Sequence, residues 1–518
     1  MKRILLFLLF VVLACQVGAQ TISQSELDSY VARVMKEFEV PGISVAVVKD
    51  GKVLAAKGYG VRKLGDPTPV DSKTLFGIAS NTKVFTATAL ALLAEEGKLE
   101  WDAPVINYLP SFRLSDPYVT REITIRDLLV HRSGLGLGAG DLLWWPPSTY
   151  NRKEIAHRLR YLPLVTSFRS AYAYDNVLYL IAGEVIEAVS GLTWEQFVET
   201  RILNEVGMTT SNVNHSDAIA GGNIATTHAR IDGNVRIVKP FTSDNTNPAG
   251  GINSNADDMA KWMIVQLDSG RVSPSKRLFS PQTTRELWSI VTPLGTGVPP
   301  PEVAPIRANF NGYALGLGIR DYRGYKMVSH TGGLPGYVSR VAIIPELKAG
   351  VTVLTNQESG AAFNAITYYV LDRLMNAPKF DWFGGISTLV KREMASAESA
   401  DKETAAKRDA NAKPSLPLEK YAGTYRDAWY GDVMIEKQGE KMTIRFTKTP
   451  SLIGDLSYWQ YETFVARWHD RELRADAFVT FALNPDGSIE QVKMKAVSPT
   501  TDFSFDFHDL TLKPVASQ

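Results

Sequence analysis

The chain has 518 residues, of which 45% are hydrophobic and 21% are charged. These proportions are typical of a globular protein, and they exclude a disordered chain or a membrane protein. Because 56 basic residues stand against 55 acidic ones, no electrostatic argument favours nucleic acid or an anionic membrane as a partner. The length predicts two or three domains.

The N-terminus has the pattern of a secretory signal peptide. Two basic residues are followed by the apolar run Ile4–Ala14, which is too short to span a bilayer. Small residues then suit cleavage after Ala19, so residues 1–19 are expected to be removed and the protein to be exported to the periplasm. Cys15 offers the alternative of a lipoprotein. Cys15 is the only cysteine of the chain, so cleavage after Ala19 would leave a protein without a disulfide or a thiolate metal site.

The next residues predict a helix followed by a β-hairpin. Helical periodicity runs from Ile22 to Glu39. Residues 42–60 form two apolar runs joined by Asp50-Gly51, a dipeptide typical of hairpin turns. We expect this hairpin to begin an antiparallel sheet.

The stretch Leu75–Leu99 predicts a buried helix that carries a polar pair. Ser80 and Lys83 stand three residues apart, just before the apolar run Val84–Ala94. On a helix such neighbours have Cβ atoms roughly 5–6 Å apart, so the lysine can reach the serine oxygen. A hydroxyl needs a base beside it to act as a nucleophile.

Two later segments place polar residues at the start of predicted helices. Thr124 and Asp127 resemble a capping box before a short apolar run. Tyr174-Asp175-Asn176 precedes the apolar helix Val177–Val189. The loop between them carries Trp144-Trp145, which we interpret as packing, lid or substrate-contacting residues.

Strand-like runs return toward residue 355. They are Tyr313–Ile319, Val338–Ile344 and Val351–Thr355, and His330-Thr331-Gly332-Gly333 stands before the second run. Together with the hairpin at 42–60, they predict an α+β fold in which one antiparallel sheet, flanked by helices, joins both ends of the domain.

The C-terminal part predicts a separate small domain. Residues 391–415 have the composition of a linker or an exposed helix. Short β-type runs and the turn at 484–487 then predict a small β-barrel-like domain over residues 416–518. The first folded domain is accordingly expected at residues 20–390.

Ser-x-x-Lys occurs three times, so the pattern alone is a weak signal. The pairs are Ser80–Lys83, Ser273–Lys276 and Ser399–Lys402. A proline interrupts the second pair, and the third lies in a charged stretch, so only the first opens a buried helix. Only the first is also followed by Tyr-x-Asn and by His-Thr-Gly, each of which occurs once in the chain.

In this order, the motifs Ser80-x-x-Lys83, Tyr174-x-Asn176 and His330-Thr331-Gly332-Gly333 resemble the serine β-lactamase and penicillin-binding-protein superfamily. More narrowly, the chain is similar to the class C β-lactamase-related esterases and peptidases, over roughly residues 25–375. Residues from Leu416 on resemble the small β-domain often appended to such hydrolases.

The resemblance implies a role for each motif residue. Ser80 would attack a carbonyl carbon and form an acyl-enzyme. Lys83 would need burial to lower its pKa from about 10.4, and Tyr174 would share the proton, so which of them is the base stays open. Asn176 would bond a substrate carbonyl and orient Lys83. The backbone N–H groups of Ser80 and Gly333 would bind the oxyanion.

His330 departs from the family's pattern, which usually has lysine at this position. Histidine has a pKa near 6.5 and offers no permanent cation to a substrate carboxylate, which favours esters, amides or peptides over β-lactams. Arg169 either replaces that cation or forms a structural ion pair. The other histidines lack metal-ligand spacing, so we expect no metal and no cofactor, and His131 is expected to hold its loop by hydrogen bonding.

These features predict an exported serine hydrolase with a Ser-Lys-Tyr centre, acting on a small peptide, amide or ester. A peptidase is favoured, and a carboxylesterase or a β-lactamase is the alternative. From another class, a non-catalytic, penicillin-binding-protein-like binding or scaffold protein is the competing hypothesis. Neither nucleic acid nor a membrane span is expected, and the oligomeric state stays open.

Overall fold

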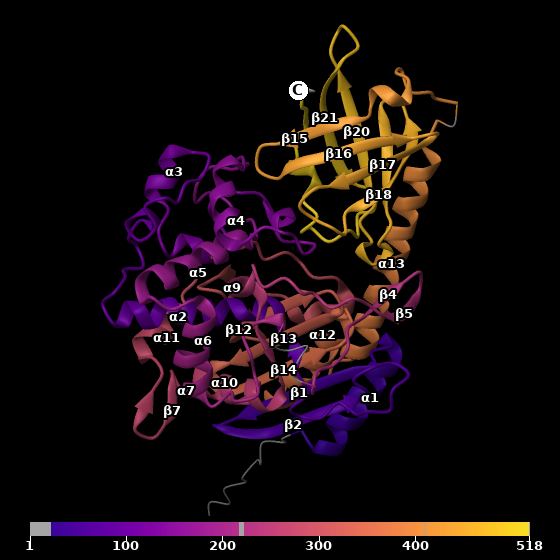
Figure 1. Ribbon diagram of the computed structural model, residues 1–518. Coiled ribbons are helices and arrows are strands. Elements are labelled where there is room, and N and C mark those ends of the chain that lie inside the picture. Colours follow the sequence, from indigo (N-terminus) through magenta and orange to yellow (C-terminus); the bar gives the residue numbers. More distant parts are fainter. Residues whose placement is uncertain (1–21, 217–221, 410, 517–518) are drawn as a thin grey trace, which may run out of the picture.

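The computed structural model describes residues 22–216, 222–409 and 411–516. The predicted signal peptide and Cys15 therefore lie outside the described residues. A large domain of helices around an antiparallel sheet is followed by a smaller all-β domain, which lies against it (Figure 1). The predicted fold class is confirmed.

An eight-stranded antiparallel sheet forms the centre of the large domain. Its strand order is β2-β1-β14-β13-β12-β11-β10-β9, so the N-terminal hairpin pairs with the last strand of the domain. In the hairpin turn, Asp50 and Gly51 have φ angles of 50° and 73°, which this dipeptide tolerates. The prediction that one sheet joins both ends of the domain is confirmed. The strands are β1 (Gly42–Lys49), β2 (Lys52–Gly60), β9 (Thr292–Pro293), β10 (Asn311–Tyr313), β11 (Gly318–Tyr322), β12 (Tyr325–Leu334), β13 (Tyr337–Ile344) and β14 (Ala349–Thr355).

Helices cover both faces of this sheet and enclose two cores. On one face, α1 (Gln24–Phe38) packs with α12 (Gly360–Leu374) over the side chains of alternate strand residues. On the other face lie α2 (Lys83–Glu95), α5 (Val177–Ser190) and α10 (Ala256–Leu267). In the described part of this domain, the shorter helices are α3 (Pro117–Glu122), α4 (Arg152–Arg158), α6 (Trp194–Val198), α7 (Asn204–Val206), α9 (Asn247–Gly250) and α11 (Pro281–Leu287).

The α2 helix is the most enclosed part of the predicted site region. Every residue from Lys83 to Leu93 is buried, as expected for an apolar helix surrounded by protein. A single 3₁₀ turn, Ala79–Thr82, precedes it and carries Ser80. Three two-stranded sheets complete the domain: β3 (Phe76–Gly77) with β6 (Asn253–Ser254), β4 (His228–Ile231) with β5 (Asn234–Ile237), and β7 (Arg271–Ser273) with β8 (Lys276–Arg277).

In the strand region one prediction is wrong and one strand was not predicted. The run Tyr313–Ile319 is not one strand, because β10 ends at Tyr313, a turn follows and β11 begins at Gly318. The segment 330–333 does precede β13, as predicted, but it also lies inside a strand of its own, β12, which the sequence did not predict. Its glycines are poor strand formers, and pairing with β11 and β13 on either side overrides that preference.

The small domain is an eight-stranded antiparallel sheet that nearly closes on itself. β22 pairs with β15 at one edge, and the bridge between Val492 and Leu512 brings it next to β21 at the other edge. The strands are β15 (Gly423–Asp427), β16 (Gly431–Gln438), β17 (Lys441–Phe446), β18 (Ile453–Gln460), β19 (Thr463–Trp468), β20 (Ala477–Leu483), β21 (Ile489–Ala496) and β22 (Lys513–Pro514).

A long helix and direct contacts join the two domains. Of the two structures expected for residues 391–415, most of the segment is helix: α13 (Trp382–Ala406) begins inside the range assigned to the first domain and ends before the second (Figure 1). Across the interface, the backbone N–H of Thr149 donates to the carbonyl of Lys448 at 2.8 Å. Arg158 donates to the carbonyl of Trp429 at 2.9 Å.

Within the described ranges, no single helix meets the length and hydropathy needed to cross a membrane. One pair of consecutive helices, 177–190 and 194–206, passes on length and composition when taken together, with a bend of 76° between them.

Candidate active site

Ser80 lies where a sharp turn enters α2. The residue before it, Ala79, has φ 51°, in the left-handed region that L-residues rarely adopt. Ser339 holds this turn from β13 by donating its hydroxyl to the carbonyl of Ile78 at 2.7 Å. A Cβ at position 332 would lie 2.2 Å from the same carbonyl oxygen, so glycine is what lets β12 approach the turn.

Lys83 is fully buried and directed at Ser80. Its Nζ lies 3.1 Å from Ser80 Oγ, 2.8 Å from Asn176 Oδ1 and 3.0 Å from the carbonyl of Ala249. Burial lowers the pKa of Lys83 to about 7, although the carboxyl groups of Asp141 and Asp175 act in the opposite direction. The structure thus brings the predicted pair together, with the lysine buried and the serine partly exposed.

Tyr174 lies beside the same two residues, just ahead of α5. Burial raises its pKa, and a hydrogen bond with Ser80 opposes this rise. The Nζ of Lys83 is 5.0 Å from the centroid of the Tyr174 ring. The ring of His131 packs against the other aromatic groups here, with its centroid 4.2 Å from that of Tyr174.

Asn176 connects Lys83 to a buried carboxyl group that the sequence did not reveal. Its Oδ1 accepts from Lys83, and its Nδ2 donates to Asp141 Oδ2 at 2.9 Å. Although Asn176 occupies the N-cap position of α5, its side chain caps no backbone N–H there. Its bonds therefore serve the site instead of the helix end.

Asp141 is completely buried and accepts hydrogen bonds from three side chains. Besides Asn176, they are Trp144, whose Nε1 lies 2.9 Å from Oδ1, and Ser504, whose Oγ lies 2.8 Å from Oδ2. Burial raises the pKa of Asp141 to about 7, and these bonds oppose the rise. Ser504 belongs to the C-terminal domain, so both domains contribute to this part of the site.

His330 and Gly333 lie on β12, the strand of the central sheet that borders the site. His330 Nδ1 lies 2.6 Å from the carbonyl of Thr331 and must donate to it, so Nε2 accepts from the Tyr313 hydroxyl at 2.8 Å. Burial and the proximity of Lys83 lower the pKa of His330 to about 3, so its ring is neutral at pH 7. Gly333 is exposed and lines a cavity.

This cavity, of about 930 Å³, lies between the two domains. Its walls include Trp145 and Phe241 from the large domain, and Leu473 and Phe505 from the small one. Of the charged side chains at its walls, several are paired. The pairs are Lys239–Asp470 at 2.7 Å, Arg474–Glu358 at 2.7 Å, and Arg230 with Glu39.

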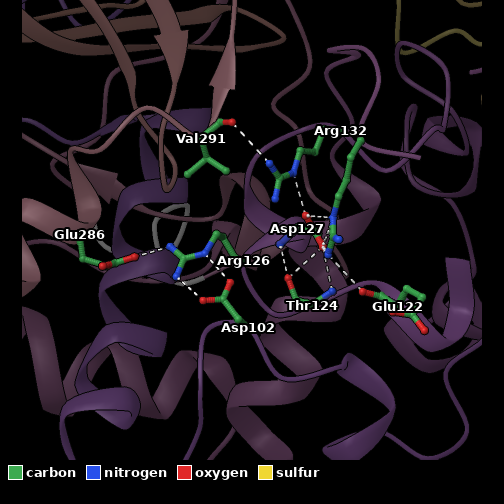
Figure 2. A network of polar contacts seen from close by, with 9 residues as sticks. Asp102, Glu122, Thr124, Arg126, Asp127, Arg132, Glu286 and Val291 are labelled. Atoms are coloured by element: carbon green, nitrogen blue, oxygen red, sulfur yellow. Dashed lines mark hydrogen bonds and ion pairs between the residues drawn. The ribbon is translucent and has the colours of Figure 1, made fainter. Parts of the chain in front are cut away.

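Arg169 forms the structural ion pair that was one of its two expected roles. Its Nε lies 3.1 Å from an oxygen of the buried Asp127. Figure 2 shows Asp127 bonded to Thr124 and Arg132 as well. The backbone N–H of Thr124 donates to Asp127 Oδ2 at 3.0 Å and that of Asp127 donates to Thr124 Oγ1 at 3.3 Å, which confirms the capping box predicted at 124–127. A third arginine of this region, Arg126, links Asp102 and Glu286.

His131 has the structural role predicted for it. Its Nδ1 accepts from the backbone N–H of Asp175 at 3.2 Å, which ties the loop at 131 to the start of α5. Burial and the nearby charge of Lys83 hold its pKa well below the ordinary value. Within the described residues, no group of three or more His, Cys, Asp or Glu side chains could hold a metal ion.

A family model described as Beta-lactamase matches residues 27–374. The chain belongs to the beta-lactamase family. The match runs from within α1 to the end of α12 and includes every residue of the three motifs. A second model, for a domain of unknown function (DUF3471), matches residues 407–514.

Some relatives of this beta-lactamase-family chain match it over nearly its whole length. "Unguisins hydrolase ungD'" of Aspergillus campestris is 29% identical over 497 residues, which cover 91% of this chain and 90% of that protein. The octameric penicillin-binding protein homologue from Pyrococcus abyssi is 20% identical with a TM-score of 0.59, covering 95% of this chain and 100% of that one. A class C β-lactamase mutant is 18% identical with a TM-score of 0.56, covering 68% and 98%.

Two residues that support the site, Asp141 and Ser504, lie outside the sequence motifs and were not predicted. Asp141 is the acidic residue in an otherwise apolar run, Gly140 to Trp145, and a lone acid in such a run is a signal for a buried carboxyl group. Ser504 has no such signal. It follows Asp141 by 363 residues, and only the docking of the C-terminal domain brings the two together.

Proposed function

We propose that this protein is a serine hydrolase that transfers acyl groups through Ser80. The observation that carries the proposal is the contact of 3.1 Å between Ser80 Oγ and the Nζ of Lys83, a lysine whose pKa burial lowers to about 7. A general base works best when its pKa lies near the pH of the reaction. Of the two candidate bases, this favours Lys83 over Tyr174.

The proposed first step is a proton transfer coupled to attack. A neutral Lys83 amine keeps two N–H bonds for Asn176 and the carbonyl of Ala249, and its lone pair accepts the proton of Ser80. As the proton leaves, Oγ bonds to the carbonyl carbon of the substrate, and the electron pair of the C=O bond moves to its oxygen. The backbone N–H groups of Ser80 and Gly333 are the proposed donors to this oxyanion.

Tyr174 is the proposed proton donor to the leaving group. Its raised pKa keeps it a phenol at neutral pH, and it is hydrogen-bonded to Ser80, where the leaving atom departs. When the intermediate collapses, the bond to the leaving amine or alcohol breaks, Tyr174 protonates that atom, and the proton held by Lys83 is returned to Tyr174. Attack by water then releases the acid from Ser80 by the same transfers.

The proposed substrate is a peptide, amide or ester without a carboxylate beside the bond that breaks. A neutral His330 supplies no cation, and the basic side chains Arg230, Lys239 and Arg474 at the cavity are already paired. A charge removed from water without a partner is costly, so this cavity favours neutral groups. The relative named as an unguisins hydrolase supports hydrolysis, and we favour a peptidase or amidase over an esterase.

We also propose that the protein acts after export. The basic N-terminal residues, the apolar run Ile4–Ala14 and the small residues before Gln20 support this proposal. N-terminal sequencing of the protein recovered from the periplasm is expected to begin at Gln20. A chain that retains Met1, or one that carries a lipid at Cys15, would contradict it.

The test of the function compares four proteins with three substrates. Wild type, Ser80→Ala, Lys83→Ala and Ser399→Ala are incubated with an aryl acetate, nitrocefin and a panel of short peptides. We expect hydrolysis to be lost in the first two variants and unchanged in Ser399→Ala, whose serine lies in an unrelated Ser-x-x-Lys pair on the exposed part of α13. Activity that survives in Ser80→Ala would overturn the mechanism.

The same proteins decide between an enzyme and a binding protein. A fluorophosphonate probe that labels wild type but not Ser80→Ala is the expected result. A folded wild-type protein that the probe does not label would favour the non-catalytic alternative. The substrate hydrolysed with the highest kcat/KM then separates peptidase, carboxylesterase and β-lactamase.

A further inference from the structure

One segment of the C-terminal domain, Asp502–Phe507, reaches into the site of the other domain. We call it the insertion segment. Its Asp506 is completely buried and accepts hydrogen bonds from the backbone N–H groups of Gly140, at 2.6 Å, and Leu142, at 3.0 Å. These two residues flank Asp141. The insertion segment therefore holds the backbone of the loop that carries the buried carboxyl group.

Ser504 of the same segment bonds to the side chain of that carboxyl group. Its Oγ donates to Asp141 Oδ2 at 2.8 Å, and the same oxygen accepts from Asn176 at 2.9 Å. Asn176 in turn accepts from Lys83 at 2.8 Å. An unbroken series of three hydrogen bonds thus leads from the C-terminal domain to the amine next to Ser80.

The geometry also leaves little freedom for this series to rearrange. Ser504, Asp141, Asn176 and Lys83 are all buried. A buried polar atom that loses its partner has no water to replace it, so each bond fixes the direction of the next. An additional close contact comes from position 138, where a Cβ would lie 2.8 Å from the carbonyl oxygen of Phe503.

We propose that Ser504 is a positioning residue for the reaction: through Asp141 and Asn176 it sets the place of the Lys83 amine, so that the hydrolase domain has a complete site only when the C-terminal domain is docked. This inference rests on the proposed function. It adds a residue from the second domain to a centre otherwise built from the first, and it gives that domain a part in the rate of the reaction.

The loss of the Ser504 hydroxyl has a defined electrostatic consequence. Its hydrogen bond favours the charged form of Asp141, and that charge raises the pKa of Lys83. Without the bond, Asp141 holds its proton to higher pH, Lys83 has a weaker anion near it, and the pKa of Lys83 falls. The pH below which the base is protonated is therefore lower in Ser504→Ala.

Other groups around Lys83 do not change in this variant. Asp175 and Tyr174 precede α5, Tyr179 lies within it, and His131 and His330 face the lysine from the loop at 131 and from β12. None of these side chains is bonded to Ser504. Because Asp141 and Lys83 interact, the acidic limb of the pH profile reports the coupled titration of both groups and not that of Lys83 alone.

The experiment measures the rate of Ser80 labelling by a fluorophosphonate, and the hydrolysis of an aryl acetate, between pH 5 and 9 in the full-length protein. We expect Ser504→Ala to lose about tenfold in the maximal rate, as for one hydrogen bond to a charged group, to keep its KM, and to shift the acidic limb to lower pH. Ser504→Thr, which retains the hydroxyl, should recover most of the rate. Ser457→Ala, an exposed serine on β18 of the same domain, should match wild type.

Each possible outcome either supports or contradicts the role of Ser504. A Ser504→Ala protein with the rate and pH profile of wild type would overturn the inference while leaving the proposed function intact. A lower rate with an unshifted profile, or one that Ser504→Thr does not restore, would mean that the contact only packs the domains together, and it would overturn the inference too. A wild-type protein in which the probe does not label Ser80 would contradict the proposed function and this inference together.

Discussion

At the scale of single residues, the protonation of Lys83 is decided by its surroundings. Burial disfavours its charge, while two carboxyl groups and three acceptors within 3.1 Å favour it. The pKa of about 7 that results lies well below the usual value of about 10.4. A lysine in water would be almost wholly protonated at neutral pH and could not accept the proton of Ser80.

This pKa predicts how the reaction depends on pH. Below pH 7 the fraction of neutral Lys83 falls tenfold per pH unit, so kcat/KM for an aryl ester should fall with the same slope. Lys83→Arg should remove the base at every pH and lose about 100- to 10,000-fold, because a guanidinium does not deprotonate. Lys276→Arg, in an unrelated Ser-x-x-Lys pair, is the matched control. A Lys83→Arg enzyme with an unchanged profile would exclude Lys83 as the base.

At the scale of secondary-structure elements, the approach of β12 to the turn before α2 sets the position of Ser80. The strand passes so close that any side chain at 332 would meet the carbonyl of Ile78, the Cβ of Ala79 at 2.9 Å and the hydroxyl of Ser339 at 2.7 Å. The turn is also bonded to β13 through Ser339. Strands β12 and β13 and the start of the helix are thus held as one unit.

We predict that Gly332→Ala displaces this unit. The added methyl group cannot fit without moving β12 or the turn, so the free energy of unfolding should fall by about 1–3 kcal/mol, and Ser80 should react more slowly with a fluorophosphonate. Urea unfolding and labelling rates measure the two effects. Gly295→Ala, where a Cβ would meet nothing within 4 Å, is the control. Equal stability of the two variants would contradict the predicted close approach.

The elements also indicate how far sequence reasoning reaches. Patterns within a few residues predicted the hairpin at Asp50-Gly51, the capping box of Thr124 and Asp127, and the helix after Lys83. These features form through interactions between residues that are close in the sequence. The run 313–319 was predicted as one strand since its apolar residues alternate with glycine, yet a turn with Gly316 at φ 77° divides it. β12 was missed because its stability comes from neighbours on both sides.

At the scale of the whole molecule, the two domains meet around a cavity, and ion pairs at its walls link them. Arg474 of the small domain lies 2.7 Å from Glu358 of the large one, and Lys239 lies 2.7 Å from Asp470. Such contacts between distant residues carry no periodic signal, so neither the cavity nor the bond from Ser504 to Asp141 could be predicted from the sequence. The motifs predicted the residues next to Ser80 and none of those that support them from the second domain.

We predict that the pair Arg474–Glu358 helps to keep the insertion segment docked. Arg474→Glu should repel Glu358, and since a partly exposed pair contributes about 1 kcal/mol or less, the amides of Gly140 and Leu142 should exchange with solvent up to about fivefold faster. The double variant Arg474→Glu with Glu358→Arg should restore their protection. Arg426→Glu, in a pair within the small domain, is the control. Unchanged exchange in Arg474→Glu would contradict this role.

The bond between Asp141 and Ser504 has a consequence for the order in which the protein matures. During synthesis, Asp141 leaves the ribosome 363 residues before Ser504 does. A newly made first domain therefore carries its nucleophile and its lysine for some time without the support of the second. If Ser504 positions Lys83, full hydrolytic activity appears only after the C-terminal domain has folded, and the nascent chain is a poor catalyst until then.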